Sequence, residues 1–150
     1  MIIEYTPEGA EQQRFDAGRL RASEIQIVER TADGRWGEIK EAMSEGDINA
    51  MRTVAFVLKR RSEPGLRLAD FDPFEDELRV RLDARETRAY AQQLFEKYQA
   101  DPDDLAAAFA ELRDATADPE ACEQAIADVT APKDPAPTED DESPASPSGS

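Results

Sequence analysis

The segment from Asp47 to Arg61 is apolar most of the way round, and it constrains the fold more than any other part of the chain. Asp47 is a typical N-cap residue, and Lys59-Arg60-Arg61 places positive charge where the negative end of a helix dipole is expected. A helix that is apolar on several sides must be covered on several sides. We therefore expect this helix at the centre of a domain or at an interface with a partner.

Two shorter helices are predicted before it, from Ser23 to about Thr31 and from about Arg35 to Glu45. Ser23 with Gln26 three residues later resembles a capping box, and Gly46 supplies a stop for the second helix. The second helix also carries large apolar side chains at spacings of three and four, which is the pattern of an amphipathic helix. These side chains are Trp36, Ile39 and Met43.

Short extended runs are expected near the N-terminus. Ile2–Tyr5 and Gln12–Phe15 flank a turn that contains Pro7 and Gly9, so we expect a hairpin that needs the helices for support.

Later in the chain, Asp72-Pro73 predicts the start of a short helix that continues through Phe74, Leu78, Val80 and Leu82. The segment from Leu78 to Leu82 alternates and could instead be extended, and this alternative stays open.

Three further helices are predicted at 84–99, 102–115 and 119–129, each after an aspartate that can cap it. Their apolar stripes are thin and rich in alanine, so each helix should pack weakly alone. The stripes are Tyr90, Leu94 and Tyr98, then Leu105, Phe109 and Leu112, then Cys122, Ala125 and Ile126.

The last segment, 131–150, holds five of the ten prolines, four serines and five acids against one lysine. It has too little apolar surface to offset the entropy of ordering, so a disordered tail is expected. The predicted fold is a mostly α protein, a small helical bundle with an N-terminal β-hairpin and an acidic Pro/Ser-rich tail. We divide it into an extended segment 1–18, a helical core 19–82, C-terminal helices 83–130 and the tail 131–150, and its length favours a single core.

The net charge and the small number of reactive side chains exclude several classes of function. A net charge of −16 disfavours nucleic-acid binding, although an acidic mimic of nucleic acid remains an alternative. The chain has no histidine and one cysteine, Cys122, so it lacks the residues for an intrachain disulfide or a usual zinc site. The first residues carry no basic n-region and no apolar run approaches the length of a spanning helix, so we expect no signal peptide and a cytoplasmic protein that does not bind membranes.

No nucleotide-binding loop or nucleophile and base pair is evident, so we expect a protein without catalytic residues, cofactor or metal. Catalysis would have to rest on carboxylates alone. Asp103-Asp104, Asp140-Asp141 and Asp70 with Asp72 could bind a divalent cation, but helix starts and soluble tails favour acids for other reasons. A carboxylate metal enzyme is therefore a minor alternative.

The order of features from Phe15 to Leu82 resembles the tail assembly chaperones of siphophages that infect actinobacteria. The similarity lies in the tryptophan-bearing helix Arg30–Asp47 with its Gly-Asp break, the apolar helix Ala50–Arg61 with its basic end, and the segment Pro64–Phe71. The resemblance implies a protein that binds the long tape measure protein and helps to recruit major tail tube subunits during morphogenesis. It also implies a longer frameshifted product and absence from the mature virion. We further expect several copies on each client or self-association.

The expected client-binding surface lies on the second and third helices. Methionine and aromatic side chains there can form an adaptable apolar surface for a client helix, but they are as easily ordinary core. The candidate residues are Trp36, Ile39, Met43, Met51, Val54, Phe56 and Leu58.

Overall fold

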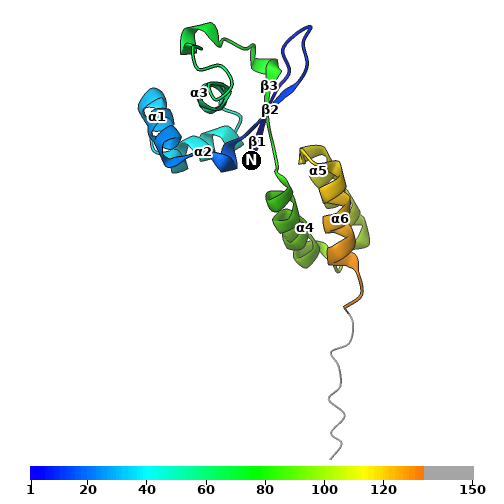
Figure 1. Cartoon of the computed structure of the whole chain (residues 1–150). Coiled ribbons are helices and arrows are strands. Elements are labelled where there is room, and N and C mark those ends of the chain that lie inside the picture. The colour runs from blue at the N-terminus through cyan, green and yellow to red at the C-terminus, as the bar shows by residue number, and fades with distance from the viewer. Residues whose placement is uncertain (134–150) are drawn as a thin grey trace, which may run out of the picture.

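The computed structural model describes residues 1–133 of the chain. The predicted disorder of the C-terminal tail concerns residues that lie, from 134 onwards, outside this range. Within residues 1–133 the chain forms six α-helices and a three-stranded antiparallel sheet, which confirms the mostly helical class. Figure 1 shows two parts, one with β1–β3 and α1–α3 and the other with α4–α6, joined at the end of β3.

The sheet has β1 (Ile2–Tyr5) at its centre, antiparallel to both β2 (Gln13–Asp16) and β3 (Leu78–Arg81). The hairpin of β1 and β2 confirms the N-terminal prediction. Ile3 is aligned with Phe15 on one side and with Val80 on the other. A third strand gives the hairpin the support that two strands alone would lack.

The strand β3 corrects the short helix predicted from Asp72. Only one 3-10 turn, Glu75–Glu77, forms there, and the chain is extended from Leu78. The alternation of apolar and charged residues explains this outcome, because it lets Leu78 be buried while Arg79 is exposed. The free edge of β1 supplies the backbone partners.

The helices α1 (Ala22–Ala32), α2 (Trp36–Ser44) and α3 (Ile48–Lys59) form the rest of the first part. The apolar helix α3 is central, since it lies between α1 and α2 and the sheet (Figure 1), and every side chain from Thr53 to Leu58 is buried. This confirms the prediction that it is covered on several sides.

The capping predictions hold for α3 but not for α1. The Asp47 side chain accepts a hydrogen bond of 2.8 Å from the backbone N–H of Ala50. The predicted pair Ser23 and Gln26 does not cap α1, which begins one residue before Ser23. Instead, the backbone N–H of Arg21 donates to the Glu24 carboxylate at 2.8 Å, and the same carboxylate pairs with Arg61 at 2.6 Å.

The helices α4 (Ala84–Tyr98), α5 (Pro102–Ala115) and α6 (Pro119–Thr130) form the second part. The side chains of Asp83, Asp101 and Asp118 all cap their helices as predicted. These helices bury a cluster of their own, and none of its buried members belongs to the first core. The cluster consists of Ala91, Phe109, Leu112, Cys122, Ala125 and Ile126.

The expectation of a single core is therefore wrong. The sheet offers an apolar face to α3, with Ile3 and Leu78 in the first core. Its opposite face carries Glu4, Arg14 and Arg81 and contacts the second part through hydrogen bonds. Because charged groups line that face, the two apolar clusters do not merge.

Candidate partner-binding site

The seven residues predicted to bind a client come together, but they do so in the interior of the first part. None of the six aliphatic, methionine and phenylalanine side chains in the set is more than 6% exposed. Trp36 is half-buried, with the Lys40 ammonium 5.8 Å from its ring centre. In this fold the seven residues form part of the interior of the first part, and the six buried ones offer no exposed apolar surface to a client. The buried six are Ile39, Met43, Met51, Val54, Phe56 and Leu58.

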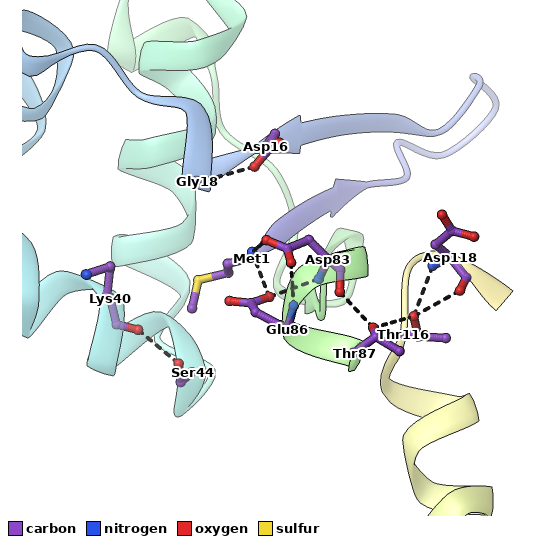
Figure 2. Close-up of polar contacts among 10 residues, drawn as sticks. All are labelled: Met1, Asp16, Gly18, Lys40, Ser44, Asp83, Glu86, Thr87, Thr116 and Asp118. Atoms are coloured by element: carbon purple, nitrogen blue, oxygen red, sulfur yellow. Dashed lines mark hydrogen bonds and ion pairs between the residues drawn. The ribbon is translucent and has the colours of Figure 1, made fainter. Parts of the chain in front are cut away.

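The junction between the two parts is a polar cluster around the N-terminal amine. The Met1 ammonium lies 2.5 Å from the Asp83 carboxylate and 2.7 Å from the Glu86 carboxylate. Asp83 also accepts from the backbone N–H of Glu86 at 2.8 Å, as Figure 2 shows. The first strand is thus tied to the first turn of α4.

The pKa values at this cluster move in the directions that favour an ion pair. Burial opposes the charged amine, but the hydrogen bonds to Asp83 and Glu86 outweigh it and raise the pKa of the Met1 amine. Burial likewise opposes the Asp83 carboxylate, while the Glu86 N–H and the ammonium together lower the pKa of Asp83. Both groups are therefore charged at neutral pH.

Two threonines fix the start of α4 against the link between α5 and α6. Thr87 is fully buried, and its hydroxyl lies 2.9 Å from that of Thr116 (Figure 2) and 2.7 Å from the Asp83 carbonyl oxygen, to which it donates. Thr116 in turn accepts from the backbone N–H of Asp118 at 3.1 Å. Every buried hydroxyl of this cluster has a partner, as a rigid junction requires.

The backbone continues the sheet into the second part. Leu82, directly after β3, forms a parallel bridge with Thr116. The Leu82 N–H donates to the Ala115 carbonyl at 2.9 Å, and the Ala117 N–H donates to the Leu82 carbonyl at 2.9 Å. Arg14 and Arg81 add hydrogen bonds to the carbonyl oxygens of Ala117 and Asp114. The connection is thus made of hydrogen bonds and ion pairs.

Beside this junction lies a groove of about 460 Å³ between α4 and α5. Its walls are mainly apolar, and Met1 and Ser44 also line it. Tyr90 lines it with 48% of its surface exposed, and among the large apolar residues of the described chain only Phe74 is more exposed. The charged residues Glu86, Glu111 and Arg81 also line it. The apolar lining consists of Met1, Val80, Leu82, Tyr90, Leu94, Ala108, Leu112 and Ala115.

The sequence places Tyr90 with Leu94 and Tyr98 on one apolar stripe, and the structure leaves Tyr90 exposed in the groove. The side chains that face inward from α4 are Thr87 and Ala91, which are fully buried, together with the half-buried Phe95. The helix therefore has two neighbouring apolar stripes at spacings of four. The second stripe, Tyr90 and Leu94, was the available signal of a surface beyond the core.

The remaining chemical candidates of the described chain are accounted for by local structure. Asp70 is paired with Arg67 at 2.9 Å, and the N–H groups of Asp103 and Asp104 donate to the Asp101 cap. Burial raises the pKa of the Cys122 thiol, whose side chain lies in the second core. Asp140-Asp141 lies outside the described residues. Nowhere in residues 1–133 do three or more acidic, cysteine or histidine side chains gather as a metal site would require.

In that same range, no helix combines the length and the apolar character needed to cross a bilayer. No family model, curated protein or solved structure matches the chain.

Proposed function

We propose that this protein is a siphophage tail assembly chaperone that binds the tape measure protein and has no catalytic activity. The observation that carries the proposal is the groove that contains Tyr90, an apolar surface on a protein with a net charge of −16. Such a protein can cover an apolar client segment while its own charge prevents aggregation. The similarity of residues 15–82 to this chaperone family supports the same function.

The apolar lining of the groove favours an amphipathic helix as the bound segment. Leu94 and Leu112 form apolar walls on α4 and α5, and Tyr90 offers a large amphipathic ring at the edge. A helix placed in such a groove inserts side chains spaced three or four residues apart. Glu111 makes no ion pair within residues 1–133, so a basic residue beside the client's apolar stripe would complement it.

The wider role follows from the family resemblance. Several copies would cover the long tape measure protein in the host cytoplasm, keep it soluble and leave before the virion is complete. A longer frameshifted product of the same gene would recruit the major tail tube protein. In this proposal the groove holds the client, and the residues packed around α3 maintain the fold.

Co-expression with a tape measure fragment tests the proposal. The wild-type protein should raise the soluble fraction of the fragment several-fold, and Tyr90→Ser should lose most of that effect. Phe74→Ser is the matched control, since Phe74 is 70% exposed and lies outside the groove. Equal solubility with wild type, Tyr90→Ser and empty vector would refute the proposed function. Inhibition of a DNA-binding protein in a competition assay would favour the acidic mimic instead.

A further inference from the structure

A second concave surface, on the other side of the junction, collects positive charge on this acidic protein. It is a cleft of about 530 Å³ between the 3-10 turn Ala17–Arg19, the start of α4 and the link between α5 and α6. Four of the eighteen basic residues of the chain line it. They are Arg14, Arg19, Arg85 and Arg88.

The carboxylates in this cleft are already engaged. Asp16 accepts from the Gly18 N–H at 2.9 Å, and Asp118 accepts from the Ala121 N–H at 3.0 Å. Asp83 binds the Met1 ammonium and caps α4 (Figure 2). Within the described residues, none of these three carboxylates forms an ion pair with an arginine of the cleft.

Most of the arginines, by contrast, have no partner in the described part of the chain. Arg14 pairs with Glu4 at 3.3 Å and donates to the Ala117 carbonyl at 2.9 Å. The exposed side chains of Arg19, Arg85 and Arg88 form neither a hydrogen bond nor an ion pair with any residue in 1–133. Three guanidinium groups around one concavity make a site for a run of carboxylates, which guanidinium binds in a two-pronged geometry.

We propose that this cleft binds the acidic run Glu139-Asp140-Asp141-Glu142 from the C-terminal segment of the same molecule. The run presents four consecutive carboxylates, a denser set than any other in the chain. A nucleic acid is a poor occupant, because the net charge of −16 repels a phosphate backbone.

The chain is long enough for this contact. The helix α6 starts beside Asp118, which lines the cleft, and its 12 residues carry the chain about 18 Å away. The stretch from Thr130 to Glu139 spans up to about 30 Å when extended, which is enough to return to the cleft. The contact joins exposed charges, so salt should weaken it.

Paramagnetic broadening in the full-length protein tests the contact. A nitroxide attached to Ser143→Cys should broaden the amide signals of Gly18, Arg19, Arg85 and Arg88. Cys122, the natural cysteine, is fully buried. Wild-type protein treated with the same nitroxide reagent shows whether Cys122 also reacts. The variant Arg85→Gln/Arg88→Gln and high salt should each remove most of the broadening. Arg30→Gln, an exposed arginine on α1, is the control and should leave it intact.

The outcomes distinguish the acidic run of the same molecule from the acidic run of a second copy. Absence of broadening at the cleft, or broadening that survives both the double variant and high salt, would overturn the proposal. If mixing nitroxide-labelled ¹⁴N protein with unlabelled ¹⁵N protein broadens the same cleft signals to a similar extent, the acidic run belongs to a second copy, which also overturns the proposal. The experiment needs no client protein, so its result is independent of the chaperone function.

Discussion

The ammonium group of Met1 lies 2.7 Å from the carboxylate of Glu86, which ties the first strand of the sheet to the first turn of α4. The carboxylate of Asp83 also binds this amine, at 2.5 Å. The two cores share no buried apolar residue, so this ion-paired cluster and the Leu82–Thr116 bridge define how the two parts sit together.

Asp83→Asn should lower the free energy of unfolding by about 1 kcal/mol, because it removes the charge that faces the amine. Asparagine is itself a good N-cap residue, so the start of α4 should persist. Asp101→Asn is the matched control, since Asp101 caps α5 with no ammonium nearby, and it should change stability by a few tenths of a kcal/mol. Urea unfolding at pH 7 measures both, and equal effects would contradict an ion-pair contribution.

The ion pair between the Met1 amine and the Asp83 carboxylate should make the free energy of unfolding depend on pH, both in acid and in alkali. The pKa of the amine is raised above its ordinary 8.0, so its contribution is complete below pH 8 and is lost as the pH rises through the folded value. The pKa of Asp83 is lowered below 3.8, so its contribution is present above that pH and is lost as the pH falls through the folded value. The stability gap between wild type and Asp83→Asn should therefore be widest between about pH 4 and pH 8. A gap that is constant from acid to alkali would rule this out.

Glu4→Gln should destabilise the protein by about 1–3 kcal/mol. Glu4 is only 8% exposed and lies between Arg14 at 3.3 Å and Arg81 at 3.6 Å, and a neutral amide would leave both cations less well compensated. Glu11→Gln provides the comparison, because Glu11 is exposed and pairs with no residue of the described chain. Thermal unfolding measures the two variants, and a Glu4 variant as stable as the Glu11 variant would refute the expectation.

Met43→Ala should cost about 2–5 kcal/mol, the range for emptying a buried site of this size. Met43 is fully buried in the first core, so the variant should reveal a packing role. Trp36 is the sole tryptophan and lies beside this core, so its fluorescence in urea reports the transition. A loss below about 1 kcal/mol would mean that Met43 is not packed as described.

Phe109→Ala should cost about 3–5 kcal/mol in the second core and leave the first core largely intact. Phe109 is 5% exposed and belongs to the cluster of α4, α5 and α6. Amide hydrogen exchange should therefore accelerate in these helices, while the amides of Val54 and Phe56 in α3 keep most of their protection. Equal acceleration in both parts would show that the two cores unfold as one unit.

Much of the local structure is already present in the sequence. The aspartates at 47, 83, 101 and 118 predict where four helices begin, because a short carboxylate side chain before a helical run caps its free N–H groups. The burial of α3 follows from its breadth of apolar residues, and Pro7 and Gly9 place the hairpin turn. These signals depend on neighbours within a few residues.

Other features of the fold depend on contacts between distant residues. The segment from Leu78 became a strand because β1, more than seventy residues earlier, had an unpaired edge. The division into two cores arose because Glu4, Arg14 and Arg81 occupy the sheet face that meets the second part. Neither the pairing of β3 with β1 nor the contact of the charged sheet face with the second part could be identified from periodicity. Periodicity shows which side chains share a face, but it does not show which distant segment packs against that face.

At the candidate site, too, the sequence determined some features and the tertiary structure decided others. The sequence determined that Tyr90 and Leu94 share one side of a helix and that Met43, Met51 and Phe56 are strongly apolar. Only the tertiary structure decided which set is covered, because α3 is enclosed by α1, α2 and the sheet, whereas α4 meets α6 along the stripe of Ala91 and leaves Tyr90 in an open groove. Hydrophobicity is a property of a side chain, but burial depends on which neighbours the whole fold supplies.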